Sequence, residues 1–152
     1  MPKTLAEFQN LKYNNPEKWE HLKDFKKYVT RVPEATEVDY EIYKKIKSVV
    51  HDGIVRVPAD KIDASALTFR DEHAARHGCT VEQGRYYVKT ALYSVTKERW
   101  DGMSVNYFST SGATYIDPNT MQIKTCYGKD NFDASTKKVM EVIHGDGILP
   151  GN

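Results

Sequence analysis

Three stretches of alternating apolar and polar residues between positions 103 and 127 constrain this fold more than any other feature of the chain. In the first stretch the apolar residues Met103 and Val105 alternate with polar neighbours. Turn-forming residues at 109–112 and 117–120 separate the three stretches. Successive side chains of a strand point to opposite faces of a sheet, and such turns join antiparallel neighbours. The pattern therefore predicts three short antiparallel strands in a meander.

Two helices are expected before this sheet. The first would begin at Asp63 or Ser65 and end at Gly78, a residue that tolerates the left-handed stop. The second opens with the capping box Thr80-Val81-Glu82-Gln83, and its apolar stripe extends to Val95. A closing helix is expected after Asp133, whose side chain can cap it.

The first 50 residues show helical patterns of a highly charged kind. Asn15-Pro16 is typical of a helix start, and Val32-Pro33 ends that helix. A further helix with Ile42 and Ile46 on one face follows, and residues 54–58 alternate like a short strand.

The expected fold class is therefore α+β, with N-terminal helices followed by a small domain. We expect residues 1–50 to form a helical extension or docking segment. Residues 51–152 would hold two helices, the short antiparallel meander and the closing helix.

The overall composition excludes several classes of protein. The formal net charge is +1, so bulk electrostatics does not predict a nucleic-acid binder. No apolar run approaches the roughly 20 residues of a membrane span, and the first ten residues lack the apolar core of a signal peptide. Cys79 and Cys126 are too few for a disulfide scaffold, so reduced thiols and a cytoplasmic site of action are the expectation.

Two histidines provide the clearest candidate chemistry. His73 and His77 are four residues apart, so on the expected helix both rings project from one face. They can be ordinary packing histidines, zinc ligands or general acid–base catalysts. Zinc is disfavoured, because the metalloprotease pattern needs glutamate directly after the first histidine and Ala74 stands there.

Hydroxyl and cationic residues gather in the expected sheet. Ser109 belongs to a hydroxyl cluster at a hairpin tip, which is either a polar turn or an oxyanion site. Lys124, Thr125, Tyr127 and Lys129 lie on or just after the last strand, where they either pack or meet an anionic ligand.

The order of these parts resembles the C-terminal toxin-like domains of phage minor head (MuF-type) proteins. Those domains belong to the barnase/EndoU/colicin-nuclease/RelE-like group of metal-independent RNases. The similarity extends over about residues 50–145 and is carried by the segments EHAARHG, TVEQ, YFSTSGATYID and QIKTCYGKDNFD. One departure is that residues 61–152 carry as many acids as cations, whereas the nucleases of the group are often basic.

The resemblance implies an endoribonuclease that uses the substrate's own 2′-hydroxyl as nucleophile, with no metal and no cofactor. The implied catalytic residues are His73, His77, Ser109, Thr125 and Tyr127. The implied RNA-binding residues are Arg76, Arg85, Tyr107, Lys124 and Lys129. The implied partners are an RNA such as tRNA, an immunity protein and phage head proteins, with delivery from a phage particle or secretion system and no membrane association.

Two alternatives remain. The first is a non-enzymatic phage head or interaction module in which the histidines have no catalytic role. The run Tyr107-Phe108-Ser109-Thr110-Ser111 also resembles the strand of arginine-type ADP-ribosyltransferases. Those enzymes need a downstream Glu-x-Glu, and the only glutamate after Ser111 is Glu141.

Overall fold

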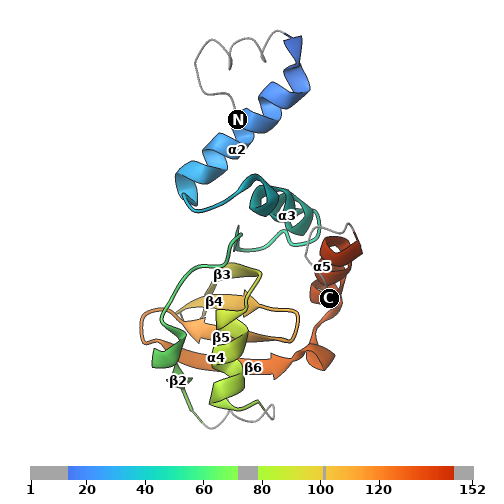
Figure 1. Ribbon diagram of the computed structural model, residues 1–152. Helices are drawn as coiled ribbons and strands as arrows, with labels where there is room; N and C mark the ends of the chain where they lie inside the picture. The colour runs from blue at the N-terminus through green and yellow to red at the C-terminus, as the bar shows by residue number, and fades with distance from the viewer. Residues whose placement is uncertain (1–13, 72–78, 101, 146–152) are drawn as a thin grey trace.

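The computed structural model describes residues 14–71, 79–100 and 102–145 and confirms the α+β class (Figure 1). The helices are α2 (Pro16–Arg31), α3 (Glu37–Lys47), α4 (Val81–Lys89) and α5 (Ala134–Gly145), with short 3-10 turns η1 (Ala64–Ala66) and η2 (Lys129–Asn131). The strands are β1 (Ile54–Arg56), β2 (Thr68–Phe69), β3 (Tyr93–Arg99), β4 (Gly102–Phe108), β5 (Gly112–Asp117) and β6 (Gln122–Gly128).

The strands form one sheet in the order β1-β3-β4-β5-β6-β2. The predicted meander is its centre, since β4, β5 and β6 pair antiparallel in sequence order. β3 extends the meander on one side and is itself flanked by β1, while β2 pairs parallel to β6 at the opposite edge.

The expectation that the capping-box helix continues to Val95 is wrong. Thr80 and Gln83 form the predicted capping box, with Thr80 Oγ1 accepting from the Gln83 N–H at 3.1 Å. The helix ends at Lys89, however, and Val95 lies in β3, opposite Asn106 of β4. Tyr, Val and Thr favour strands, and pairing along seven residues of β4 outweighs the helical periodicity.

The helix expected between Asp63 and Gly78 is also wrong over the described part of that range. Asp63 does act as a cap, because its Oδ1 accepts from the Ser65 N–H at 3.1 Å, but it caps only η1. Leu67 is extended, and Thr68 and Phe69 pair with β6. Residues 72–78 lie outside the described residues.

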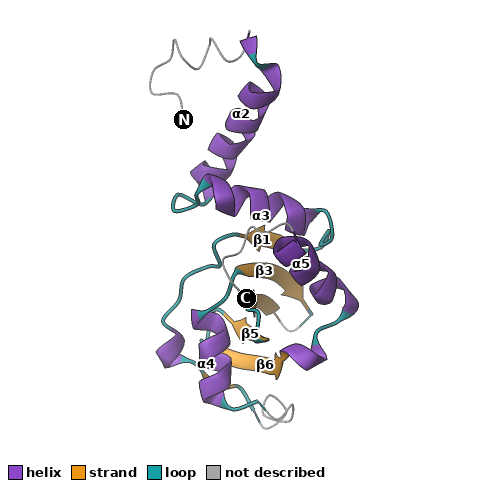
Figure 2. Cartoon of the chain, turned by 45° about the vertical axis from the view of Figure 1, so that its right-hand side comes forward, coloured by secondary structure: helices purple, strands orange, loops and turns teal. Residues whose placement is uncertain are grey.

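Each face of the sheet carries its own core, and the two faces are named here by the helices that cover them. On the α5 face α3 and α5 cover a cluster of Ile42, Ile46, Val55, Val57, Tyr93, Val95, Phe108, Ala113, Phe132, Val139 and Ile143 (Figure 2). On the α4 face a second cluster contains Leu67, Tyr87, Val88, Val105, Tyr107, Ile116, Ile123 and Cys126. The sheet is therefore buried on both sides.

The N-terminal helices form where they were expected. Asn15 caps α2 by accepting from the Lys18 N–H at 3.2 Å, and the helix ends at Arg31 before Val32-Pro33. Fully buried Ile46 of α3 packs in the α5-face core, so packing is continuous across the boundary expected near residue 50.

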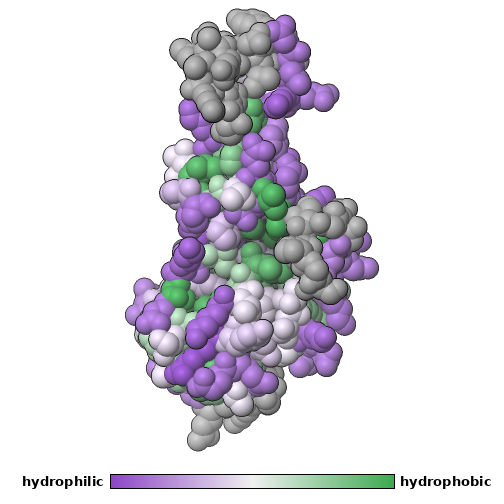
Figure 3. Space-filling model, viewed as in Figure 1, coloured by the Kyte–Doolittle hydropathy of each residue, from purple (hydrophilic) through white to green (hydrophobic). Residues whose placement is uncertain are grey.

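α2 itself reaches away from the sheet (Figure 1). Figure 3 shows hydrophobic residues gathered at mid-height, below the hydrophilic surface of this helix. Within the described ranges, no helix has both the length and the apolar character needed to cross a bilayer.

Candidate functional site

The segment that carries His73, Arg76 and His77 lies outside the described residues, but both of its flanks are placed. On the N-terminal side the Arg70 N–H donates to the Ile123 carbonyl of β6 at 2.9 Å. On the C-terminal side Cys79 forms a disulfide with Cys126 of the same strand. The described residues on both sides of this segment are therefore bonded to β6.

The disulfide overturns the expectation of two reduced thiols. Cys79 and Cys126 are 47 residues apart in sequence, and the fold brings their Cα atoms to 6.0 Å, within the range that a disulfide spans. No described cysteine remains as a free thiol. Sequence counting missed this bond because it depends on Cys126 of β6 pointing to the side where α4 begins.

β6 itself carries three of the predicted site residues. Thr125 lies opposite Tyr115 and Tyr127 lies opposite Ala113, so both side chains point to the α5 face, away from Cys126. Ile123 pairs with the residue that follows Tyr115, which leaves Lys124 as the extra residue of a bulge. A bulge redirects the side chains around it, so Lys124 departs from the regular alternation.

The α5 face contains a row of polar side chains, of which only Thr125 was expected from the sequence. Asn106, Tyr115 and Thr125 lie side by side on β4, β5 and β6. Asn106 is 2% exposed and its Oδ1 accepts from the Ser104 hydroxyl at 2.6 Å. In the sequence, the only indication of this row was that every second residue of β4 is polar. Periodicity alone does not show that these polar residues are buried.

Thr125 has the one buried hydroxyl in this row that lacks a partner. Its Oγ1 is inaccessible and makes no hydrogen bond to any described residue. Leaving a hydroxyl in that state costs about 1–3 kcal/mol. An unsatisfied buried group of this kind requires an explanation, and a ligand oxygen reaching Thr125 would supply one.

Tyr127 bonds to its neighbour in the sheet. Its hydroxyl lies 2.7 Å from the Tyr115 hydroxyl, across two adjacent strands. Burial, followed by this hydrogen bond, raises the pKa of Tyr127 above its ordinary value. The phenol is therefore protonated at neutral pH and serves as a hydrogen-bond donor rather than as a base.

Ser109 serves the hairpin turn. Its hydroxyl donates to the Gly112 carbonyl at 3.1 Å and accepts from the N–H groups of Ser111 and Gly112 at 3.2 Å each. One donor and two acceptor sites are all that a hydroxyl offers, so none remains for a phosphate. Of the two roles that the sequence allowed, the geometry fits the polar turn.

Lys129 lies beside the same turn. Its backbone N–H donates to the Ser111 carbonyl at 2.9 Å, and its side chain is exposed on η2. It is therefore near Tyr127 in the chain but at the opposite end of β6 from Lys124.

Two other residues expected to bind RNA lie apart from this group, on the α4 face. Tyr107 is completely buried, so its ring has no exposed side on which a base can stack. Arg85 of α4 donates to the Leu67 carbonyl through Nε at 3.0 Å and Nη2 at 2.8 Å, and Nη1 donates to Glu82 at 3.0 Å. These bonds hold α4 to the segment before β2.

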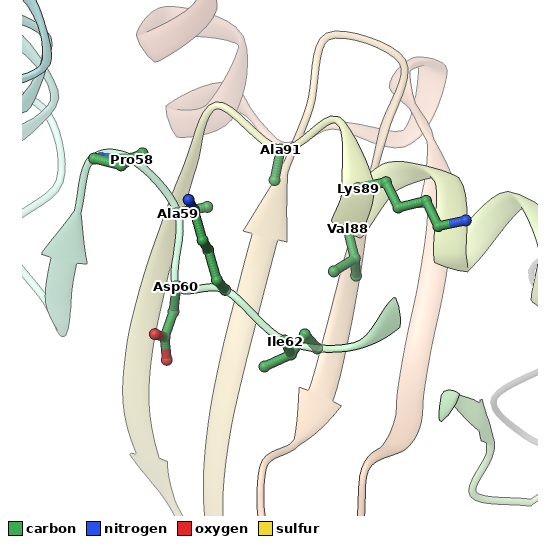
Figure 4. A pocket seen from close by; sticks show the side chains of 8 residues that line it. Pro58, Ala59, Asp60, Ile62, Val88, Lys89 and Ala91 are labelled. Carbon is green, nitrogen blue, oxygen red and sulfur yellow. The ribbon is translucent and has the colours of Figure 1, made fainter. Parts of the chain in front are cut away.

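A pocket of about 380 Å³ also opens on the α4 face (Figure 4). Pro58, Ala59, Ile62, Val88 and Ala91 contribute apolar surface to it. In Figure 4 the Asp60 carboxylate and the Lys89 ammonium point in opposite directions. Since its polar groups do not converge, this pocket is a weaker candidate for chemistry than the α5 face. Among the described residues, no group of three or more His, Cys, Asp or Glu side chains is arranged to hold a metal ion.

Comparison with protein families, curated proteins and solved structures found no match to this chain. Function is therefore inferred from the residues themselves. The group with the most chemistry is β6 with its neighbours: a cation, an unpartnered hydroxyl and a protonated phenol on one strand, to which the flanks of the two-histidine segment are bonded.

Proposed function

We propose that this chain is a metal-independent endoribonuclease. The 2′-hydroxyl of the substrate attacks the adjacent phosphorus, so that a 2′-O–P bond forms and the P–O5′ bond breaks. One of His73 and His77 removes the 2′ proton, and the other protonates the leaving 5′ oxygen. The products are a 2′,3′-cyclic phosphate and a free 5′-hydroxyl.

The observation that supports this proposal most is the bonding of both flanks of the histidine segment to β6. Arg70 and Cys79 flank the segment, and they bond to Ile123 and Cys126. Lys124 and Thr125 lie between those two attachment points. The flanks of the histidine segment and the groups suited to a phosphate thus share one strand, with Cys126 on its α4 face and Thr125 on its α5 face.

The β6 side chains take the supporting roles in this mechanism. Lys124 supplies positive charge, and the Thr125 hydroxyl donates to a phosphate oxygen of the pentacoordinate transition state. The Tyr115–Tyr127 pair uses one of its two hydroxyl protons in its own hydrogen bond, so one proton of the pair remains as a second donor on the same face. Ser109, Tyr107 and Arg85 receive no role, because the turn, the core and α4 already use them.

The proposed substrate is cellular RNA, with tRNA as the first candidate, and the proposed site of action is the cytoplasm. A toxin of this kind requires an immunity protein in the cell that makes it. We expect such a protein to block the residues that carry the acid–base chemistry, His73 and His77.

The test is RNA cleavage in the presence of EDTA. Purified protein is incubated with total RNA and with tRNA, beside the variant His73→Ala/His77→Ala and the matched control His21→Ala/His144→Ala. Cleavage by the wild type and the control alone, with DNA left intact, is expected. Full activity of the His73/His77 variant would overturn the assignment of these histidines.

A second function, partner binding without turnover, is favoured by the arrangement of α2. This helix and α3 frame a groove of about 310 Å³ lined by Tyr28, Tyr40 and Tyr43. The Arg31 guanidinium lies 5.2 Å from the Tyr28 ring and 5.5 Å from the Tyr43 ring. If the chain is an interaction module, no nucleic acid is cleaved under any ionic condition, so the same assay separates the two functions.

A further inference from the structure

A small pocket opens on the α5 face where α5 begins. It has a volume of about 180 Å³ and lies between the loop at 49–52, the first turn of α5 and strands β3 to β5. Tyr93, Val95, Phe108 and Tyr115 line its sheet side. These residues give it a largely apolar and aromatic wall, and its size suits one ring system rather than an extended ligand.

Two carboxylates, one ammonium group and several neutral polar groups lie around this wall. The polar part of the lining consists of His51, Asp52, Lys97, Asp133, Ser135 and Thr136, and Val49 and Val50 add further apolar surface. Asp52 Oδ2 is 3.7 Å from Lys97 Nζ, so these two charges offset each other. The pocket therefore offers both acceptors and donors without a strong net charge.

Asp133 disfavours an anion at this place. Its Oδ1 accepts from the Thr136 N–H at 2.8 Å and caps α5. A helix N-terminus attracts anions, but here a carboxylate already occupies that position and would repel a phosphate. Asp133 Oδ2 makes no hydrogen bond to a described residue, so it is available to accept from a neutral ligand.

Tyr93 contributes a second available group. It is 1% exposed and lines the pocket, and its hydroxyl has no hydrogen-bond partner among the described residues. Burial, with smaller effects of Tyr115 and Asp133, raises the pKa of Tyr93, so the phenol remains neutral. The hydroxyl itself is not inaccessible, unlike those of Tyr107 and Thr125, so a ligand in the pocket can reach it and bond to it.

We propose that this pocket binds a nucleobase that carries an exocyclic amino group. A base is a flat, neutral ring with a polar edge, which matches apolar walls bordered by acceptors and donors. The carboxylates of Asp52 and Asp133 accept hydrogen bonds from an amino group but repel the carbonyl oxygen that replaces it in inosine or uridine. Adenine and cytosine are therefore preferred over hypoxanthine and uracil.

The pocket adjoins the site on β6, and the inference rests on the function proposed above. Tyr115 lines the pocket, bonds to the Tyr127 hydroxyl and lies opposite Thr125. An RNA strand with its phosphate at Thr125 would therefore place a neighbouring base close to this pocket. The pocket acts as a base-specificity subsite of the nuclease.

The test measures binding of mononucleotides to the full chain by calorimetry at neutral pH. AMP is compared with IMP and CMP with UMP, since in each pair the amino group is replaced by a carbonyl and the neighbouring ring nitrogen gains a proton. We expect the amino partner to bind about tenfold more tightly, the effect of one hydrogen bond to a charged group. Asp133→Asn, which preserves the helix cap, and Tyr93→Phe, which preserves the ring packing, should each weaken that binding.

The matched control is Asp130→Asn, an exposed carboxylate on η2 outside the pocket, which should leave the preference unchanged. Equal affinities within both pairs, no binding at all, or a preference that survives Asp133→Asn would overturn the subsite. The binding assay needs no turnover, so the two proposals can fail separately. A preference for the amino-bearing nucleotide without RNA cleavage would support the base-binding pocket and contradict the nuclease function. RNA cleavage without such a preference would contradict the base-binding pocket alone.

Discussion

The Tyr28 hydroxyl bonds to both backbone groups of Val57. It donates to the Val57 carbonyl at 2.8 Å and accepts from the Val57 N–H at 2.7 Å. Tyr28 lies on α2 and Val57 directly follows β1, so one side chain ties the N-terminal helix to the edge of the sheet. Val57 is 1% exposed, so water cannot take the place of the Tyr28 hydroxyl on the Val57 N–H and carbonyl unless the surrounding residues rearrange.

Tyr28→Phe should therefore destabilise the chain by about 2 kcal/mol or more, because two buried backbone groups lose their partner. The measurement is urea unfolding followed by circular dichroism. Tyr43→Phe is the control: its ring packs 4.4 Å from that of Tyr28, but its hydroxyl bonds to no described residue. Both variants keep the aromatic ring. An equal loss of unfolding free energy in the two variants would therefore mean that the Tyr28 hydrogen bonds do not contribute and that ring packing alone holds α2.

The two glycines at the end of the β5–β6 ladder should respond differently to alanine. Gly112 and Gly128 lie opposite each other. A Cβ at Gly112 would collide with the Tyr87 ring and lie 2.6 Å from the Tyr127 carbonyl oxygen, whereas at Gly128 its nearest neighbour is the Tyr87 hydroxyl at 3.7 Å. We expect Gly112→Ala to lower the free energy of unfolding by roughly 1–3 kcal/mol and Gly128→Ala to leave it within about 0.5 kcal/mol.

Reduction of the Cys79–Cys126 disulfide should lower stability. The bond closes a loop of 47 residues, and constraining a loop of that length in the unfolded chain contributes at most about 4 kcal/mol. The measurement is urea unfolding with and without a dithiol reductant. The variant Cys79→Ala/Cys126→Ala should not respond to the reductant, and an unchanged wild type would show that the bond does not contribute.

Replacement of Thr125 by valine should separate stability from activity. Valine has the same shape but no hydroxyl, so Thr125→Val removes an unpartnered buried group and should leave stability equal or up to about 1 kcal/mol higher. RNA cleavage should fall, because the phosphate loses a donor.

Thr114→Val is the control for this exchange on the neighbouring strand. The Thr114 hydroxyl donates to the Gly84 carbonyl at 2.8 Å, so this variant should lose stability. A loss of stability in Thr125→Val as large as that in Thr114→Val would argue that its hydroxyl has a structural partner after all.

Alkaline pH should destabilise the fold through its buried tyrosines. Burial raises the pKa values of Tyr93, Tyr107 and Tyr127 above the ordinary value near 10. The folded chain then holds these protons more tightly than the unfolded chain. Stability is complete below about pH 10 and falls as the pH rises further, by up to about 1.4 kcal/mol per pH unit for each tyrosine.

The measurement is the free energy of unfolding between about pH 9 and 11.5, with tyrosinate absorbance recorded in parallel. Tyr127→Phe should lessen the alkaline decline, and Tyr86→Phe, which removes a phenol from a residue that is 54% exposed, is its control. A free energy of unfolding that stays constant over this pH range would contradict the expectation.

Features written in short stretches of sequence were predictable. Asn15 and Asp133 cap helices, Thr80 and Gln83 form a capping box, and the turn at 117–120 joins two strands of the meander. Each of these depends on hydrogen bonds between residues two to four positions apart. The α+β class follows from such local signals together with the alternation between residues 103 and 127.

Only the tertiary structure decided what depends on distant neighbours. Val95 lies in a strand, despite its helical pattern, because β3 pairs with β4. Cys126 forms a disulfide with Cys79 because the alternation of side chains along β6 points Cys126 toward the start of α4. The same alternation turned Thr125 toward Asn106 and Tyr115, so the polar row on the α5 face came from register. Local hydrogen bonds are encoded by neighbouring residues, whereas pairing, register and burial depend on free energies shared between segments far apart in the chain.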